Sequence, residues 1–268
     1  MKGLGVAHLT ALDLDPVTLV RQAGQAGFAS VGLRLHPVMV GALAYPMAVG
    51  SQVLRDLKAV MAWEGVRVSD IEFVSLTPEV DVAGFEPLLA SGAELGAVSL
   101  TVSGDDAQTT RLSHNFAALC ELAGRYGLRV DLEFMRWRQV GTLQQALAVL
   151  AAAGQVNSSV VVDALHLYRS GGDALAIAQV DPRHLRAVQL CDAPLLAPAE
   201  ALIIQEAREG RLLPGQGELP LAQLLAVMPS DVAVSVEIPS SRLQGEERLQ
   251  AAYAVTRDWM DRAGVSGF

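Results

Sequence analysis

Short runs of β-branched and other apolar residues recur along the chain, and each is followed by a longer stretch in which apolar residues have helical spacing. Eight of the short runs predict strands, at residues 5–9, 30–35, 67–74, 97–102, 129–133, 159–163, 185–191 and 231–237. Eight alanine- and leucine-rich stretches predict helices, at residues 17–26, 51–63, 84–95, 109–126, 143–153, 173–179, 219–227 and 245–263. The pattern is therefore a strand and a helix in alternation, repeated eight times.

Glycine occurs repeatedly where a predicted helix gives way to the next strand, at Gly27, Gly65, Gly96, Gly127 and Gly154. Glycine accepts the left-handed conformation that ends a helix before a tight turn. The strands read as nearly continuous apolar runs, which are typical of a parallel sheet covered on both faces. Eight such units in 268 residues predict a single (β/α)8 TIM barrel domain spanning residues 1–268. A doubly wound open sheet gives the same alternation, but no G-x-G-x-x-G motif follows the first strand, so we favour the barrel.

The composition narrows the class of protein. The chain is 51% hydrophobic and 18% charged, which excludes a disordered protein. Every apolar run is interrupted before the roughly 18 residues that a membrane span needs, and the N-terminus lacks the pattern of a signal peptide. The two cysteines, Cys120 and Cys191, have neither metal-type spacing nor a disulfide pattern. We therefore expect a cytoplasmic protein that does not bind membranes.

The net charge of the chain indicates which kinds of partner it can bind. There are 20 lysines and arginines against 29 aspartates and glutamates, a net charge of −9. Such a chain is not expected to bind nucleic acid, because binding requires a basic surface that neutralises phosphates. A small-molecule substrate is the partner that fits, and whether the barrel forms a homo-oligomer stays open. The surplus of carboxylates raises the question of where they lie.

Polar residues close the last four predicted strands: Glu133, Asp163, Gln189 with Asp192, and Glu237. In a parallel barrel the carboxyl ends of the strands meet at one mouth, where barrel enzymes have their active sites. Carboxylates gathered there repel one another and are costly to desolvate, and a divalent cation offsets both costs. Oxygen ligands suit Mg²⁺ or Mn²⁺, and Zn²⁺ or Co²⁺ also fit. The alternative is that each acid is a solvated strand-end residue or a helix N-cap.

The order Glu, Asp-x-x-His, Gln-x-x-Asp and Glu on strands five to eight resembles the xylose isomerase-like TIM barrel family. The segments Ala-Gly-Phe at 26–28, Val-Gly-Leu-Arg at 31–34 and Leu-Pro-Gly-Gln-Gly at 213–217 are similar to it as well. The family comprises sugar and sugar phosphate isomerases and epimerases, inosose-processing enzymes, endonuclease IV relatives and metal-dependent 3-dehydroshikimate dehydratases. The resemblance covers essentially the whole chain.

The resemblance implies one divalent metal ion (Mn, Mg, Co or Zn) bound by Glu133, Asp163, Gln189 and Glu237. Sugar epimerases of the family usually carry histidine where this chain has Gln189, and glutamine at that position points to the dehydratase branch. Endonuclease IV uses several more histidine ligands. With only five histidines and a net charge of −9, this chain is not expected to act in DNA repair.

The chemistry implied by such a metal site is proton abstraction next to the carbonyl of a small hydroxy-ketone. In an isomerase or epimerase, Glu133 and Glu237 would be ligands and acid–base groups on opposite sides of the substrate. In a dehydratase, one base removes a proton next to the ketone and a β-hydroxyl then leaves. His166, three residues after Asp163, is the predicted base, although it fits a helix-start histidine bonded to a backbone carbonyl equally well.

Four further residues are predicted to contact the substrate. Arg211, in the long loop after strand seven, would bind an anionic group, and Arg34, at the end of strand two, is a second candidate. Glu72, near the end of strand three, would bond substrate hydroxyls or support the metal site. His8 ends the first predicted strand and would face the mouth. The alternatives are loop arginines paired with nearby glutamates and a structural role for His8.

The leading interpretation is a divalent-metal-dependent sugar (phosphate) isomerase or epimerase acting on a polyhydroxy-ketone. The first alternative is a lyase resembling 3-dehydroshikimate dehydratase that uses the same metal site, an interpretation that Gln189 favours. The second alternative is a non-catalytic sugar-binding barrel, in which the polar strand ends do not converge.

Overall fold

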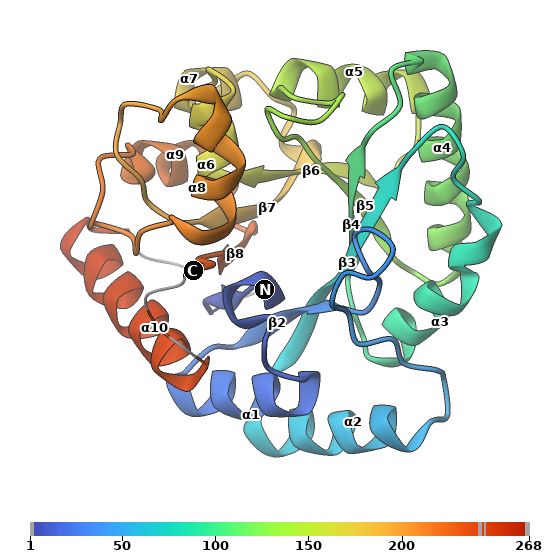
Figure 1. Cartoon of the computed structure of the whole chain (residues 1–268), viewed down its shortest axis with the longest axis horizontal. Coiled ribbons are helices and arrows are strands. Elements are labelled where there is room, and N and C mark those ends of the chain that lie inside the picture. The colour runs from blue at the N-terminus through green and yellow to red at the C-terminus, as the bar shows by residue number, and fades with distance from the viewer. Residues whose placement is uncertain (1–2, 241–242, 244, 266–268) are drawn as a thin grey trace.

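A computed structural model of the chain describes residues 3–240, 243 and 245–265. Eight parallel strands pair in chain order and close into a barrel, in which β8 returns to β1 with Ser235 opposite Gly5 (Figure 1). The strands are β1 (Gly5–Val6), β2 (Ser30–Arg34), β3 (Arg67–Leu76), β4 (Ser99–Gly104), β5 (Arg129–Glu133), β6 (Ser158–Asp163), β7 (Leu185–Leu190) and β8 (Ala233–Val236). The predicted TIM barrel is confirmed.

Helices surround the barrel as an outer ring (Figure 1). Those predicted are α1 (Pro16–Ala26), α2 (Gln52–Glu64), α3 (Glu86–Glu94), α4 (Thr109–Arg125), α5 (Leu143–Ala153), α7 (Ala174–Ala178), α9 (Leu221–Val227) and α10 (Gly245–Arg262). Two short α-helices were not predicted, namely α6 (Ala164–Arg169) and α8 (Ile203–Glu209). Within the described ranges, no helix combines the length and the apolar composition that crossing a membrane requires.

The helix ends follow the local sequence. Asp15 caps α1, because its carboxylate accepts hydrogen bonds from the main-chain N–H groups of Val17 and Thr18. Thr142 and Gln145 form a reciprocal capping box at the start of α5. Gly154 ends that helix with a φ of 64°, the left-handed conformation that glycine adopts without strain.

Successive residues of the strands lie on opposite faces of the sheet, and the two faces differ in polarity. The outward residues are apolar and form the core with the helices; they include Leu33, Leu100, Leu132, Val162, Val188 and Val236. The inward residues are largely polar, and those that line a cavity of about 30 Å³ inside the barrel include Asp70, Thr101, Asp131, Gln189 and Ser235. The sheet is parallel and buried on both faces, as the apolar runs predicted, and what they did not predict is the largely polar character of its inner face.

The polar interior is held together by side-chain bonds. Arg129 makes two bonds to the carboxylate of Asp131, at 2.6 and 2.7 Å, and the Ser159 hydroxyl donates to the same carboxylate at 2.5 Å. Asp70 accepts a hydrogen bond from the hydroxyl of Ser69 at 2.8 Å. Burial, together with the neighbouring carboxylates of Glu72 and Asp131, raises the pKa of Asp70 to about 7.

The first strand is shorter than predicted. His8 lies in a 3₁₀ helix (His8–Ala11) rather than in the strand. The reason is its ring, which is fully buried: Nδ1 accepts a hydrogen bond from the Arg34 main-chain N–H at 2.9 Å, and Nε2 lies 2.9 Å from the carbonyl oxygen of Leu14. Both ring nitrogens of His8 are therefore engaged by main-chain groups.

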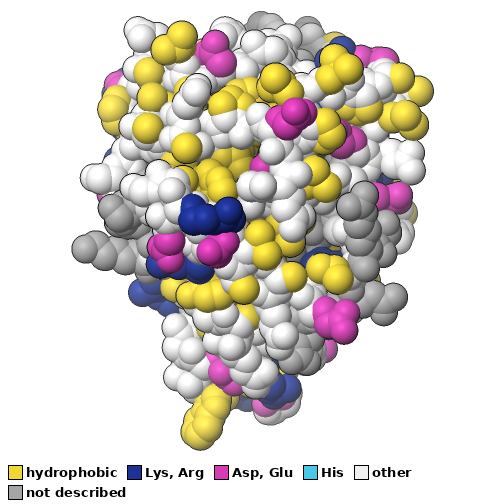
Figure 2. Space-filling view, turned by 90° about the vertical axis from the view of Figure 1, so that its left-hand side faces the viewer, with side chains coloured by type: hydrophobic (Ala, Val, Ile, Leu, Met, Phe, Trp, Pro, Cys, Tyr) yellow, Lys and Arg dark blue, Asp and Glu magenta, His cyan; other side chains and the backbone are white. Residues whose placement is uncertain are grey.

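The molecular surface mixes charges of both signs. On the face shown in Figure 2, Lys and Arg side chains lie beside Asp and Glu side chains, with hydrophobic side chains scattered between them. Exposed pairs such as Arg262 with Asp258, 2.8 Å apart, are of this kind. Such surface pairs contribute little to stability, so the fold depends on the apolar layer between strands and helices.

Candidate metal centre and pocket

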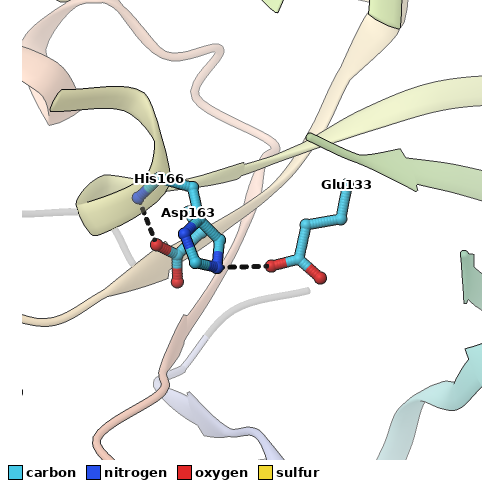
Figure 3. Close-up of side chains that lie close together, drawn as sticks. All are labelled: Glu133, Asp163 and His166. Carbon is cyan, nitrogen blue, oxygen red and sulfur yellow. Dashed lines mark hydrogen bonds and ion pairs between the residues drawn. The ribbon is translucent and has the colours of Figure 1, made fainter. Parts of the chain in front are cut away.

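Three buried side chains converge at the carboxyl ends of β5 and β6. They are Glu133, Asp163 and His166, and one ligand atom of each lies within 4.8 Å of the others. Figure 3 shows Glu133 reaching from β5 toward the His166 ring, with Asp163 beside that ring. The Oε1 atom of Glu133 is 3.6 Å from Nε2 of His166. The arrangement can hold a metal ion.

The junction between β6 and α6 explains why Asp163 and His166 meet. Asp163 is the last residue of β6 and also the N-cap of α6, because its Oδ1 accepts a hydrogen bond from the His166 main-chain N–H at 2.8 Å. The helix α6 follows β6 without an intervening loop. Residue 166 is therefore close to the carboxylate that caps the helix. His166 is thus at a helix start, but its ring contacts side chains, including an edge-on contact with Trp137 at 5.0 Å.

Arg211 lies inside the same cluster. Its Nη1 donates to Oδ2 of Asp163 at 2.5 Å, and its Nη2 is 3.1 Å from Oε2 of Glu237. Nη2 also lies 3.4 Å from Nε2 of His166. The Nε–H donates to the carbonyl of Ala207, in the last turn of α8, at 2.8 Å. The guanidinium of Arg211 therefore joins Asp163 to Glu237.

Gln189 and Glu237 form a second pair beside the first group. The Nε2 of Gln189 donates to Oε1 of Glu237 at 3.3 Å, and both residues are buried. The Oε1 atoms of Gln189 and Glu133 are buried without any hydrogen-bond partner within the described part of the chain. Of the four predicted ligands, Glu133 and Asp163 thus meet around His166, while Glu237 is tied to Gln189 and Arg211.

The electrostatics of the cluster follow from burial. Burial and the neighbouring carboxylates of Glu237 and Asp163 raise the pKa of Glu133 well above its usual value. Burial raises the pKa of Glu237 to about 8 in spite of Arg211. Burial would also raise the pKa of Asp163, but Arg211 and the hydrogen bond from His166 hold it below the usual value. Burial lowers the pKa of His166 to about 4. The cluster is therefore short of positive charge.

A divalent ion fits these residues. The carboxylate and amide oxygens of Glu133, Asp163, Gln189 and Glu237 form a donor set that suits Mg²⁺, Mn²⁺, Co²⁺ or Zn²⁺. The buried Oε1 atoms of Glu133 and Gln189 have no hydrogen-bond partner among the described residues, which is costly for polar atoms unless something else satisfies them. A positive ion would bind these two oxygens and would also offset the negative charge of the carboxylates.

A pocket of about 300 Å³ opens beside the cluster. Its charged lining includes Glu72, Glu133, Glu237, Arg34 and Arg211. Its apolar lining comprises Leu9, Leu12, Val38, Met39, Ala42, Leu43, Phe73, Met135, Trp137 and Ala207. A ligand in this pocket would meet the charged cluster and an extensive apolar surface.

The other three residues predicted to contact the substrate, Arg34, Glu72 and His8, are linked to one another by hydrogen bonds. Arg34 Nη2 is 3.2 Å from Oε2 of Glu72, and both side chains line the pocket. Glu72 Oε1 and Arg34 Nε have no hydrogen-bond partner among the atoms that the structure describes. His8 lies behind Arg34 and has both ring nitrogens engaged by main-chain groups. Contact between these three residues and a substrate stays a prediction.

Two further arginines, Arg138 and Arg208, line the pocket besides Arg34 and Arg211. Arg138 belongs to the loop after β5 and pairs with Asp105 at 2.9 Å. Arg208 lies in the last turn of α8. Its side chain is exposed and has no bonded partner within the described part of the chain. Nothing in the sequence around Arg138 marks it, whereas Arg208 shares its loop with Arg211.

Asp192 is separate from the metal cluster. Its carboxylate accepts three main-chain hydrogen bonds, from Ala193 at 2.9 Å, Gly215 at 2.9 Å and Leu219 at 3.0 Å. Its main chain also pairs with Leu212 in both directions. Asp192 therefore fixes the turn that contains the Leu-Pro-Gly-Gln-Gly segment and, with it, the chain beside Arg211.

The fold and the buried cluster define a TIM barrel with a candidate metal centre at the carboxyl ends of its strands. The sequence profile described as "xylose isomerase-like TIM barrel" matches residues 20–262. The chain belongs to the xylose isomerase-like TIM barrel family.

The curated relatives are dehydratases. The chain is 33% identical to the 3-dehydroshikimate dehydratase of Pseudomonas aeruginosa over 144 residues, which are 53% of this chain and 22% of that protein. The enzyme of the same name from Pseudomonas putida is 32% identical over 144 residues, with the same shares of 53% and 22%. The match thus spans about a fifth of the length of these relatives.

Solved structures share the fold over nearly the whole chain. The IolI protein with a bound zinc atom has a TM-score of 0.79 at 20% identity, covering 98% of this chain and 99% of that one. AsbF of Bacillus anthracis, a probable 3-DHS dehydratase, has a TM-score of 0.79 at 16% identity, with 96% and 99% covered. D-psicose 3-epimerase of Clostridium cellulolyticum has a TM-score of 0.73 at 16% identity, with 97% and 99% covered. At these identities the likeness shows the fold.

Proposed function

We propose that this chain is a divalent-metal-dependent lyase that removes water from a small cyclic hydroxy-ketone carboxylate of the 3-dehydroshikimate type. The observation that carries the proposal is the convergence of Glu133, Asp163 and His166 within 4.8 Å, buried beside a pocket with apolar walls. The match to two 3-dehydroshikimate dehydratases over half of the chain supports it.

Glu133, Asp163, Gln189 and Glu237 would hold the metal. Bound there, the ion supplies a Lewis acid that polarises the substrate ketone. Glu133 and Gln189 each bring an oxygen that lacks a partner in the part of the chain described, and Asp163 is anchored by the His166 N–H. The protein thereby fixes the ligands before the substrate arrives.

His166 is the proposed base, and its Nε2 is the atom that takes the proton. This nitrogen is buried beside the pocket, 3.6 Å from Glu133 and 3.4 Å from the Arg211 guanidinium. The carbon–hydrogen bond next to the ketone breaks, and its electron pair becomes the new carbon–carbon double bond as the β-hydroxyl leaves. The proton held by His166 passes to the departing hydroxyl, so that water is the leaving group.

The pocket walls support a ring-shaped substrate. Phe73, Met39 and Trp137 present apolar surface that an open-chain polyol would not use, whereas the face of a cyclohexene ring would cover it. Arg208, exposed in the pocket lining, is available for a substrate carboxylate. Both features favour a cyclic carboxylate over a neutral sugar.

An isomerase or epimerase of sugars or sugar phosphates is the second candidate. The observation that favours it is that Glu133 and Glu237 both line the pocket, since two carboxylates can deprotonate one side of a carbon and reprotonate the other. The solved D-psicose 3-epimerase, which has the same fold, agrees with this alternative.

One experiment separates the two. The protein is loaded with Mn²⁺, Mg²⁺, Co²⁺ or Zn²⁺ and incubated with 3-dehydroshikimate, and the ultraviolet absorbance of an aromatic product is followed. In parallel, ketoses are incubated in D₂O and examined by NMR for deuterium at the carbon next to the carbonyl. Product formation supports the lyase, and exchange into a ketose without product supports the epimerase.

Matched variants complete the test. Glu133→Gln and Asp163→Asn are expected to lose both stoichiometric metal and turnover. Glu200→Gln, which removes only the exposed partner of Arg136, is expected to keep both. Wild-type protein that holds no metal under any loading condition and turns over neither substrate class would overturn both candidates.

A further inference from the structure

The guanidinium of Arg211 is bonded on every side. Nε donates to the Ala207 carbonyl, Nη1 donates to Asp163 and to the Glu237 carbonyl (3.2 Å), and Nη2 pairs with the Glu237 carboxylate. The Arg211 side chain is only 1% exposed. A substrate would therefore find few free donors on this arginine.

The partners of Arg211 are two of the expected metal ligands. Asp163 and Glu237 are both buried, and with Glu133 they bring three carboxylates into one cluster. Arg211 is the charged donor bonded directly to this cluster. The other arginines of the pocket lining are committed elsewhere or free, since Arg34 pairs with Glu72 and Arg138 pairs with Asp105.

Two consequences follow from placing an arginine there. The pairs with Asp163 and Glu237 stabilise the protein without metal, because buried carboxylates are costly when unpaired. A divalent ion at the same carboxylates is repelled by the fixed positive charge and must share or take over its partners. The Arg211 guanidinium and a divalent metal ion therefore compete for the same carboxylates.

We propose that Arg211 is the resident counter-cation of the metal centre and that it lowers the affinity for divalent metal by competing for Asp163 and Glu237. The inference rests on the proposed metal dependence and goes beyond it, because it assigns Arg211 a positioning role in place of the predicted substrate contact. It also couples the metal to α8, since the Arg211 Nε–H bonds to Ala207 in the last turn of that helix.

The test measures metal affinity without turnover. Mn²⁺ is titrated into metal-free wild type, Arg211→Gln and Arg211→Lys by calorimetry, with quenching of tryptophan fluorescence as a second readout. Arg211→Gln is expected to bind Mn²⁺ at least about tenfold more tightly, because the opposing charge is gone. Arg211→Lys keeps the charge and is expected to stay within about threefold of wild type.

Arg169→Gln is the matched control. Arg169 is as buried as Arg211 and makes a two-bond pair with Glu206, but it is not bonded to the metal cluster. Both glutamine variants are expected to lower the melting temperature of the metal-free protein. Mn²⁺ is expected to raise it more in Arg211→Gln than in wild type, whereas Arg169→Gln should respond to Mn²⁺ as wild type does.

Hydrogen exchange of the wild-type protein tests the same point if Arg211→Gln does not fold. Mn²⁺ is expected to change the exchange of amides at residues 203–211 and to leave α5 unchanged. Unchanged or weaker Mn²⁺ binding by a folded Arg211→Gln overturns the inference, as does unaltered exchange at 203–211 in wild type at saturating Mn²⁺. Failure of wild type to bind any divalent metal overturns the proposed function instead.

Discussion

Replacing Asp192 tests whether one carboxylate holds the loop beside the candidate metal centre. Asp192 accepts hydrogen bonds from the main-chain N–H groups of Ala193, Gly215 and Leu219 at 2.9 to 3.0 Å. Alanine removes both acceptor oxygens and with them all three hydrogen bonds. Asparagine keeps one oxygen, which can serve the two donors that now share Oδ1, and turns an amide NH₂ toward Gly215.

The loss in the free energy of unfolding depends on which of the three N–H donors water can reach. Gly215 is exposed, so water can replace its lost partner, whereas Ala193 and Leu219 are buried. A hydrogen bond to a charged group contributes about 1.5 to 3 kcal/mol, so alanine is expected to cost about 3 to 6 kcal/mol for the two buried donors. Asparagine is expected to cost about 1 to 2 kcal/mol, because only the exposed bond and the charge are lost.

Urea unfolding followed by circular dichroism measures these free energies, provided that the slope with urea is unchanged. Because Arg211 directly precedes Leu212, which pairs with Asp192, the alanine variant is also expected to bind Mn²⁺ differently from wild type. The reasoning is refuted if alanine costs less than about 1 kcal/mol, or if asparagine and alanine destabilise the protein equally.

Three further predictions follow from the site and the barrel interior. His166→Ala is expected to lower turnover at least about a hundredfold, the usual effect of losing an acid–base group, and undiminished turnover would exclude His166 as the base. Arg208→Gln is expected to raise KM about tenfold for a carboxylate substrate with little change in kcat, whereas Arg183→Gln, an exposed arginine paired with Asp181, should change neither. The pKa of Asp70 is raised in the folded protein to about 7, so the stability that its protonated form contributes is present at low pH and is lost as the pH rises from about 4 to about 7. Asp70→Asn should therefore gain melting temperature over wild type more at pH 8 than at pH 4, and a gain that is independent of pH would contradict the assigned cause.

The barrel could be predicted because its signals are local. Apolar runs, helical spacing and junction glycines such as Gly27 and Gly154 are each set by a few neighbouring residues. The strand-end rule also placed Glu133 and Asp163 correctly at the ends of β5 and β6, since the last residue of a parallel strand lies at the mouth whatever the loops do.

The rest depends on contacts between distant parts of the chain. The orientation of Arg211 is set by Asp163 and Glu237, 48 and 26 positions away, and no local pattern reports such a pair. His8 was expected at a strand end, but the main-chain N–H of Arg34 and the carbonyl of Leu14 draw it into a 3₁₀ helix. The short helix α6 was missed for a different reason, because its six residues are too few to show helical spacing.

The difference between the apolar outer face and the polar inner face of the sheet determines which substitutions the barrel can accept. The residues that pack the sheet against the helices lie on its outer face, such as Leu132 and Val188, and residues of the candidate metal centre lie on its inner face, such as Glu133 and Gln189. Substitutions on the inner face therefore leave the packing of sheet against helices intact. A library confined to the inward positions would vary the candidate site while keeping the scaffold that surrounds it.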